Sequence, residues 1–243
     1  MRVRAGLGKQ GGSSLATMAS KRGLDIVGSV FGLVLLSPLL VAIAVAIKID
    51  SPGPIFFRQS RVGKNNRLFS IFKFRSMTVD APRRGSALTI QADKRITRAG
   101  RFLRRSKLDE LPQFLNVLAG DMALVGPRPE VPQFMDFYTP EQRSTIVSVR
   151  PGMTDYAAIL FRDENSLLDQ GGDPIEIYRR QIMPIKFAYY ERYTREIGIV
   201  TDLRLILATT LLLATGRLPN WLGIGSELLA PPLFRHTGAA ASP

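Results

Sequence analysis

The sequence of 243 residues contains no cysteine and a single histidine, His236. Without cysteine, the chain can form no disulfide bond, no thiolate zinc site and no thiol nucleophile. One histidine is too few for a multi-histidine metal centre or a histidine-dependent catalytic triad. Metal binding or acid–base chemistry would therefore have to come from carboxylates, lysine or tyrosine.

Acidic residues are also scarce, because 20 Asp and Glu stand against 33 Lys and Arg, for a formal net charge of +13. This excess favours polyanionic partners such as nucleic acid, anionic lipid or phosphate esters. Residues 48–110 contain 16 basic and 5 acidic residues, so this stretch alone carries +11. Such a block is typical of the cytoplasmic side of a membrane.

Charge is absent over 22 consecutive residues, from Ile26 to Ile47. This run exceeds the roughly 7 to 15 apolar residues of a cleaved signal peptide, and it is long enough for a helix that spans a bilayer. Ser37 and Pro38 near its middle disfavour a straight helix, because proline lacks an N–H and bends the chain. The Ser37 hydroxyl can satisfy a carbonyl freed by Pro38. We expect a re-entrant helix-break-helix over residues 21–50 with both ends in the cytoplasm, and a spanning helix is the alternative.

The sequence after this segment predicts a cytoplasmic domain of mixed secondary structure. Two apolar runs, residues 55–57 and 68–74, flank a basic stretch and predict a β-hairpin. Helical spacing follows over residues 96–105, and a further helix is expected from near Asp109 to Ala119, ending at Gly120. The predicted class is mostly α with a small β-hairpin (α+β), in which the membrane segment packs with amphipathic surface helices.

The remaining segments complete the predicted organisation. Residues 178–193 place apolar and aromatic side chains on one helix face, which suits either core packing or the lipid headgroup level. The ten apolar residues 205–214 are too short to span a bilayer and predict a buried or surface-lying helix. The predicted parts are a flexible leader (1–20), the membrane hairpin (21–50), the catalytic domain (51–217) with a mobile loop (80–95), and a C-terminal tail (218–243).

Asp109 and Glu110 are the candidate reactive carboxylates. Their place at the expected helix start has an ordinary explanation, since Asp109 can cap a helix and Glu110 suits a first turn. The surrounding positive charge is greater than a cap requires, and it comes from Arg101, Arg104, Arg105 and Lys107. A helix start of this kind also suits phosphate.

Two further groups of residues are candidates for phosphate binding. Lys73 and Arg75 lie two apart on an expected strand and so share a face, which can point to substrate phosphates or to solvent. Arg128 stands between Pro127 and Pro129, in a turn whose rigidity leaves the arginine little entropy to lose on binding.

Several strings, in this order, resemble the small monotopic phosphoglycosyl transferases, a family of bacterial sugar transferases. The resemblance covers roughly residues 21–213. It rests on KRGLDIVGS (21–29), SP (37–38), SPGPIFFRQSRVGK (51–64), FKFRSM (72–77), LRRSKLDELPQFLNVLAGDMALVGPRPE (103–130), RPGMT (150–154) and YRRQIMPIKFAYYERY (178–193). The departures are Ala123 and Lys107, each at a position where the family often has serine.

The resemblance implies that Asp109 is a nucleophile that attacks the diphosphate of a UDP-sugar, releases UMP and forms a phosphoglycosyl-aspartate. Undecaprenyl phosphate then displaces this intermediate. Glu110 is expected to assist through Mg²⁺, with Mn²⁺ as a substitute, and the metal ligands are expected to be Asp109 and Glu110. Arg104 matches a family arginine that holds phosphate, and the string around Arg128 lines the family's nucleotide site.

The expected partners are therefore a UDP-sugar, undecaprenyl phosphate, membrane lipids and downstream glycosyltransferases, with no nucleic acid. The resemblance places the protein at the cytoplasmic face of the bacterial inner membrane, at the start of exopolysaccharide, capsule or glycoconjugate synthesis. A noncatalytic membrane scaffold and a membrane-tethered nucleic-acid binder are the rivals. The binder would use Phe69, Phe72 and Phe74 interleaved with Lys73 and Arg75. Which sugar is transferred, and whether the chain forms a homo-oligomer, stay open.

Overall fold

The structure is a computed structural model that describes residues 15–81, 93–161, 173–218 and 224. The described part is mostly helical and contains two small two-stranded sheets, as the predicted α+β class requires. The expectations for most of the leader, for most of the loop at 80–95 and for nearly all of the tail fall outside the described residues.

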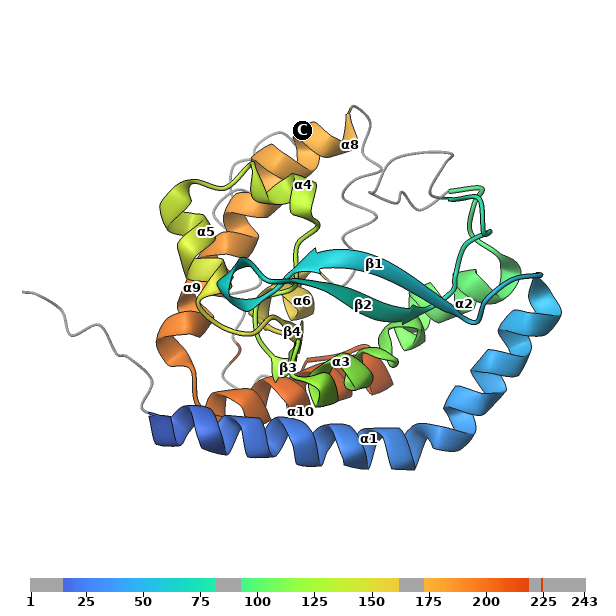
Figure 1. Ribbon diagram of the computed structural model, residues 1–243, viewed down its shortest axis with the longest axis horizontal. Helices are drawn as coiled ribbons and strands as arrows, with labels where there is room; N and C mark the ends of the chain where they lie inside the picture. Colours follow the sequence, from blue (N-terminus) through green and yellow to red (C-terminus); the bar gives the residue numbers. More distant parts are fainter. Residues whose placement is uncertain (1–14, 82–92, 162–172, 219–223, 225–243) are drawn as a thin grey trace, which may run out of the picture.

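The uncharged run forms a single long helix, α1 (Leu15–Asp50), which contains Pro38 and is bent in Figure 1. The Ser37 hydroxyl donates to the carbonyl of Val34 at 2.8 Å. Val34 lies four residues before Pro38, so its carbonyl is the one that the missing proline N–H leaves without a helical partner. The predicted break is therefore a bend within one helix, and the predicted role of Ser37 is confirmed.

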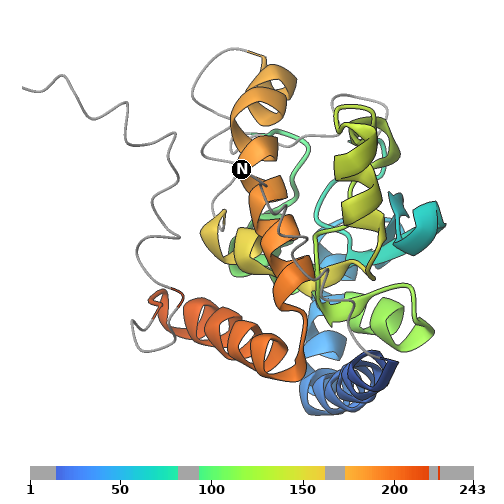
Figure 2. The same ribbon diagram turned by 90° about the vertical axis from the view of Figure 1, so that its left-hand side faces the viewer.

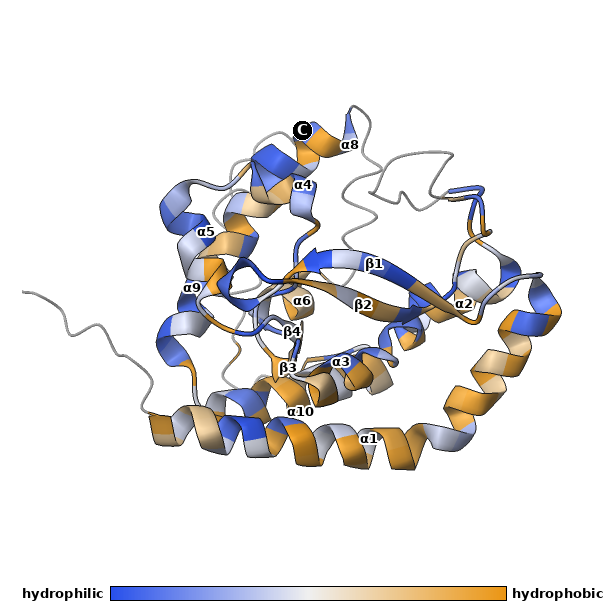
Figure 3. Ribbon diagram, in the orientation of Figure 1, coloured by the Kyte–Doolittle hydropathy of each residue, from blue (hydrophilic) through white to orange (hydrophobic). Residues whose placement is uncertain are grey.

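Most of the apolar surface of α1 is exposed. Among the described residues, α1 is the one helix long and apolar enough to cross a membrane. Val27, Phe31, Val34 and Leu35 are each more than three-fifths exposed. Figure 3 shows hydrophobic colouring along α1 and also along α10 (Ile199–Thr215), which lies on the same side of the molecule. An apolar surface of this extent indicates membrane association.

The predicted hairpin is present as β1 (Phe56–Val62) and β2 (Leu68–Phe74), paired antiparallel. A short 3-10 turn, η1 (Lys64–Asn66), joins the two strands. Asn65 and Asn66 have φ angles of 55° and 61°, a left-handed conformation that asparagine tolerates better than most residues.

The helix predicted from near Asp109 is shorter than expected. Helix α2 (Arg98–Ser106) precedes this segment, and Thr97 caps its N-terminus. A separate 3-10 turn, η3 (Leu108–Glu110), follows, and α3 (Gln113–Ala119) begins only after Pro112. The predicted end at Gly120 is correct, because Gly120 takes a φ of 88°. The cap interpretation of Asp109 is wrong, since the residue lies inside η3.

A second sheet was not foreseen: β3 (Ala123–Val125) pairs in parallel with β4 (Gly152–Thr154). Close backbone contact requires glycine here, because a Cβ on Gly126 would lie 2.4 Å from the carbonyl oxygen of Arg150. β3 contacts both α1 and α10, and β4 contacts α10, as their places in Figure 1 indicate. Figure 2 shows α1 and α10 at the same end of the molecule.

The other helices lie farther from α1 along the chain, and Figure 3 shows more hydrophilic colouring on α5 and on much of α9 than on α1. They are α4 (Pro132–Met135), α5 (Pro140–Val147), α6 (Tyr156–Leu160), α8 (Pro174–Ile177), the π-helical turn η4 (Tyr178–Ile182) and α9 (Met183–Glu196). Ile182, Tyr190 and Tyr193 are almost fully buried in the hydrophobic core. The residues 178–193 therefore form a core face, and the headgroup-level alternative is wrong for these side chains. The apolar run at 205–214 lies in α10, which is partly buried, as predicted.

Candidate active site

The turn η3 lies against strand β2 because α3, which follows it, is fixed to that strand. The Asn116 side chain accepts from the Phe72 N–H and donates to the Ser70 carbonyl, both at 2.8 Å. This pair of bonds replaces a neighbouring strand at the open edge of β2. As a result, Lys73, the residue after Phe72, lies beside Glu110.

Glu110 is held by two cations. The Lys73 Nζ donates to Oε1 at 2.8 Å, and the Arg128 guanidinium donates to both carboxylate oxygens, with Nη1 3.1 Å from Oε2. Burial raises the pKa of Glu110, but the charges and hydrogen bonds of Arg128 and Lys73 outweigh it and hold this pKa well below its ordinary value. Glu110 is thus a fully ionised bridge between two cations.

Asp109, the adjacent residue, is in a different state. It is only 6% exposed, and its carboxylate makes no hydrogen bond to any residue in the described ranges. Burial raises the pKa of Asp109, and Glu110 raises it further, while Lys73, Arg104 and Lys107 lower it in part. A desolvated carboxylate without hydrogen-bond donors is a stronger nucleophile than a solvated one.

The turn that carries Arg128 is hydrogen-bonded on both sides. Pro127 and Pro129 are buried. The Pro127 carbonyl accepts from the Gly152 N–H at 2.9 Å, and the Pro129 carbonyl accepts from Arg61 Nη1 at 3.2 Å. The guanidinium of Arg128 is therefore presented to Glu110 from a fixed backbone.

Sequence reasoning missed two buried carboxylates behind this turn. Glu130 accepts from the Tyr178 hydroxyl at 3.0 Å and from the Tyr138 hydroxyl at 3.2 Å. Asp155 caps α6 through the Ala158 N–H at 2.6 Å, and burial raises its pKa to about 6, although the Arg128 backbone N–H is among the groups that lower it. The position of Glu130 directly after the Pro-Arg-Pro turn was a signal for it, whereas no sequence pattern marked Asp155.

Arg104 and Lys107 provide additional positive charge next to Asp109. Arg104 lies in the last turn of α2, and Lys107 follows that helix with a φ of 58°. Within the described ranges, neither side chain has a hydrogen bond or ion pair, and both lower the pKa of Asp109. This cluster therefore has two positive charges that are not held in an ion pair within the described ranges, an arrangement that suits phosphate.

Arg75 does not join this cluster, so the prediction that it shares a phosphate-facing surface with Lys73 is wrong. It follows the last residue of β2 and is 4% exposed. Its guanidinium donates to the carbonyls of Pro52 at 3.0 Å and Ser51 at 2.6 Å, and to the Ser51 hydroxyl at 2.9 Å. These bonds tie the hairpin to the end of α1, so Arg75 has a structural role.

Most of the residues that the nucleic-acid alternative would use are also buried or ion-paired. Phe69 and Phe74 are buried in the core, Lys73 is paired with Glu110, and Arg75 is buried. Single-stranded nucleic acid requires exposed aromatic rings and free cations. The arrangement of this hairpin therefore offers no stacking surface built from those side chains.

Asp109 and Glu110 meet the requirements of a magnesium site in part. Mg²⁺ is usually held by one or two carboxylates together with substrate phosphates, and the described residues contain no group of three or more possible metal ligands. Asp109 has both oxygens available, whereas both Glu110 oxygens already accept hydrogen bonds from cations. An ion that used both residues would have to share Glu110 with Arg128 or Lys73.

The comparisons with known proteins agree with the resemblance in the sequence. The profile of a family described as "Bacterial sugar transferase" matches residues 16–216. A UDP-N-acetylgalactosamine-undecaprenyl-phosphate N-acetylgalactosaminephosphotransferase from Aeromonas hydrophila is 47% identical over 142 residues, which cover 58% of this chain and 34% of that protein.

Two UDP-glucose:undecaprenyl-phosphate glucose-1-phosphate transferases are also similar. The protein from Escherichia coli is 37% identical over 192 residues, and the one from Caulobacter vibrioides is 38% identical over 192 residues. Each match covers 78% of this chain, with 39% of the E. coli protein and 67% of the Caulobacter protein. The chain thus spans about a third of the A. hydrophila relative and somewhat more of the E. coli one.

Proposed function

The chain belongs to the bacterial sugar transferase family, and on this basis we propose that it transfers a sugar-1-phosphate from a UDP-sugar to undecaprenyl phosphate. The names of the relatives support the class of donor and the acceptor lipid. They differ in the sugar, since one is named for N-acetylgalactosamine and others for glucose, so the sugar used by this chain is not part of the proposal.

The observation that carries the proposal is the contrast between two adjacent carboxylates. Glu110 is neutralised by Lys73 and Arg128, while Asp109 is buried and makes no hydrogen bond within the described chain. A covalent mechanism uses an available carboxylate as the nucleophile, and Asp109 meets this requirement, whereas Glu110 is already engaged by two cations.

In the proposed reaction, an Asp109 oxygen attacks the phosphorus that carries the sugar. The bond from this phosphorus to the bridging oxygen breaks, and UMP leaves with the electron pair. An oxygen of undecaprenyl phosphate then attacks the same phosphorus and displaces the Asp109 carboxylate. The product is a polyprenyl diphosphate sugar, and the free aspartate is restored without any oxidation or reduction.

The surrounding cations have distinct proposed tasks. Arg104 and Lys107 would bind the donor diphosphate, since both lower the pKa of Asp109 and neither is held in an ion pair in the described structure. Arg128, held between Pro127 and Pro129, would keep Glu110 in place at the nucleotide side of the site. Bound by Asp109, Glu110 and the diphosphate, Mg²⁺ or Mn²⁺ would neutralise charge on the phosphoryl oxygens.

The membrane arrangement is part of the same proposal. A polyprenyl acceptor has its phosphate at the bilayer surface, so the reaction centre has to lie at that surface. The exposed apolar side of α1 together with α10 supports such a placement. We propose that the bent α1 re-enters the cytoplasmic face of the inner membrane and that residues 51–217 remain in the cytoplasm, where UDP-sugars and downstream glycosyltransferases are found.

A single experiment tests the reaction. Purified protein is offered a panel of UDP-sugars with Mg²⁺ and undecaprenyl phosphate, and UMP release is measured. In parallel, protein incubated with the active donor but without lipid is digested and analysed by mass spectrometry. We expect UMP release and a sugar-phosphate adduct on the peptide that contains Asp109. An absence of UMP with every donor would refute the function, and an adduct on another residue would refute the role of Asp109.

A further inference from the structure

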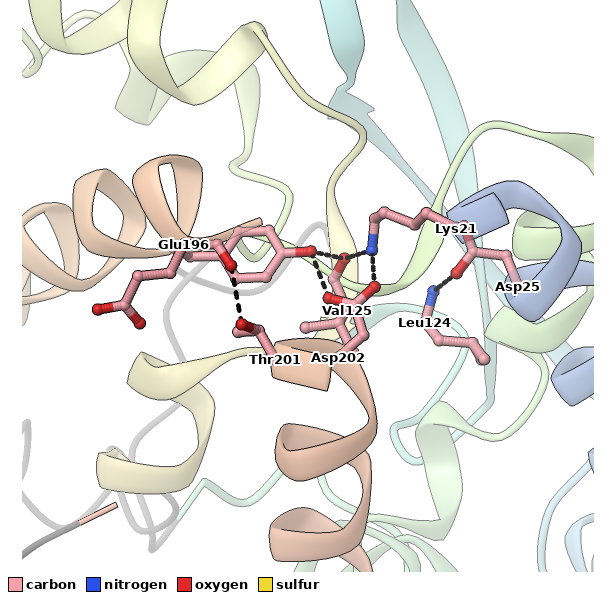
Figure 4. A network of polar contacts seen from close by, with 8 residues as sticks. Lys21, Asp25, Leu124, Val125, Glu196, Thr201 and Asp202 are labelled. Carbon is pink, nitrogen blue, oxygen red and sulfur yellow. Dashed lines mark hydrogen bonds and ion pairs between the residues drawn. The ribbon is translucent and has the colours of Figure 1, made fainter. Parts of the chain in front are cut away.

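Side chains of the membrane helix bind the backbone of strand β3. The Leu124 N–H donates to Asp25 Oδ1 at 2.9 Å, and the Val125 carbonyl accepts from Lys21 Nζ at 2.9 Å. Asp25 and Lys21 are one turn apart on α1, so they lie on the same face of the helix. In this way α1 supplies a donor and an acceptor to β3, as a neighbouring strand would, and Figure 4 shows the two contacts side by side.

The same contacts continue to two other helices. Lys21 is ion-paired with Asp202 of α10, and the Tyr193 hydroxyl of α9 donates to Asp202 Oδ1 at 2.8 Å as well as lying 2.9 Å from the Val125 carbonyl oxygen. Figure 4 shows Lys21, Asp202 and Val125 converging at one point. Side chains of α1 and α9 therefore meet at a single carbonyl at the end of β3, and Asp202 of α10 contacts both of them.

Burying this network costs more free energy than attaching α1 to the domain would require. Lys21 is 6% exposed, and Asp25, Tyr193 and Asp202 are each 1% exposed or less. Burying charged groups costs free energy that their mutual attraction only partly returns, and apolar contacts would hold α1 without that cost. Directional hydrogen bonds differ from apolar contacts in fixing one register of the helix against the strand.

The register of α1 on β3 affects the proposed reaction centre, because a short and rigid segment connects β3 to Arg128. Val125 is followed by Gly126, Pro127 and then Arg128, and the Gly126 N–H and the Pro127 carbonyl are both bonded to the β4 strand. A shift of β3 is therefore transmitted to Arg128, whose planar guanidinium donates hydrogen bonds to both oxygens of Glu110.

We propose that Lys21 and Asp25 are positioning residues of the reaction centre, which couple the seating of α1 on β3 to the placement of Arg128. The proposal rests on the proposed transferase function. It assigns to α1 a role in turnover beyond membrane attachment, because only a correctly seated α1 leaves Arg128 aligned with Glu110.

The variants that test it remove single contacts. Lys21→Met and Asp25→Leu remove the donor and the acceptor to β3, whereas Asp25→Asn keeps an oxygen that can accept from Leu124. Tyr193→Phe removes only a hydroxyl and is the milder variant should the others fold poorly. Arg22→Met is the matched control, because Arg22 also docks α1, through the carbonyls of Val117 and Leu118 at the end of α3.

The decisive measurement is a double-mutant cycle on kcat/KM for UMP release in the full-length, membrane-reconstituted protein. We expect Lys21→Met, Asp25→Leu and Tyr193→Phe to lower the rate by about 10-fold or more in the native background but by less than about 3-fold when Arg128→Gln is already present. Asp25→Asn should restore most of the rate lost in Asp25→Leu. The effect of Arg22→Met should be the same in both backgrounds. Equal losses for Lys21→Met with and without Arg128→Gln would overturn the proposal.

Hydrogen exchange supplies a readout that does not depend on activity. In Asp25→Leu and Tyr193→Phe, the peptide that covers residues 123–128 should exchange faster than in the native protein, and in Arg22→Met it should not. Unchanged exchange in this peptide would overturn the coupling even if no UDP-sugar is turned over. If the native protein turns over and the cycle is additive, the coupling alone fails, whereas a native protein that releases no UMP refutes the proposed function.

Discussion

Asp109 and Glu110 are adjacent in the chain, but only Glu110 is ion-paired in the described structure, with Lys73 and Arg128 on its two oxygens. The 3-10 turn that carries the two residues directs one carboxylate toward the cations of β2 and the Pro-Arg-Pro turn, and it leaves the other without a donor. The two residues should therefore respond differently to mutation.

Replacing the two carboxylates should separate catalysis from stability. Asp109→Asn removes the proposed nucleophile, so kcat should fall by at least about a thousandfold. Its melting temperature should stay the same or rise, because a buried charge without hydrogen bonds is removed. Glu110→Gln should lower both kcat and stability, since Lys73 and Arg128 lose the charge they share. Calorimetry beside UMP release would decide this, and a strongly destabilised Asp109→Asn would contradict it.

The pH dependence of the rate should follow Asp109. Burial and the charge of Glu110 hold the pKa of Asp109 above its ordinary value of 3.8, and the reactive form is the ionised one. The rate should therefore rise with pH along a limb centred above 3.8. Arg104 lowers this pKa, so Arg104→Gln should move the limb to higher pH. Arg101→Gln, on an exposed side chain of the same helix, should leave it in place, and equal shifts in both variants would contradict the assignment.

Stability at low pH should follow Glu110. Its pKa in the folded protein is held well below the ordinary value, so its ion pairs stabilise the fold above the unfolded-state pKa. This contribution should be lost as the pH falls below the unfolded-state value toward the folded one. Chemical unfolding measured between about pH 7 and pH 3 should show a smaller loss in Glu110→Gln than in the native protein. Identical pH profiles of stability would show that Glu110 is not the titrating group.

Two cationic residues of the hairpin region should have opposite phenotypes. Lys73→Gln should reduce kcat strongly, because Lys73 contacts Glu110 and lowers the pKa of Asp109. Arg75→Gln should instead lower the free energy of unfolding by about 1 to 3 kcal/mol, through lost bonds from the buried guanidinium to Ser51 and Pro52, with little change in kcat for the folded fraction. A selective loss of kcat in Arg75→Gln would return this arginine to the site.

The bend of α1 should decide topology. Pro38→Leu restores a helical N–H, and we expect it to straighten α1 and to move part of the protein into a spanning orientation. The measurement is labelling of an N-terminal tag from outside intact cells, which should be negative in the native protein and positive in part of the variant. Ser37→Thr keeps a hydroxyl for the Val34 carbonyl and is the matched control. External labelling of the native tag would refute the re-entrant arrangement.

The sequence alone determined the features that depend on local pattern. The uncharged run could form only an apolar helix, the strands of the hairpin followed from their apolar runs, and Gly120 ended α3 because it alone accepts a positive φ there without strain. The order of strings around Asp109 and Glu110 was sufficient to indicate the family, which the profile match over residues 16–216 then showed.

The tertiary structure decided which side chains meet, because contacts between distant segments leave no periodic trace in a sequence. Lys73 and Arg75 are two positions apart, but the strand ends at Phe74 between them, so Lys73 reaches Glu110 and Arg75 reaches the end of α1. Asp25 and Leu124 lie 99 residues apart and are joined only by the docking of α1. The sequence thus determined the long apolar helix, the hairpin and the end of α3. Packing decided that Glu110 would be ion-paired, that Asp109 would not be ion-paired in the described structure, and that α1 would be bonded to the strand that leads to Arg128.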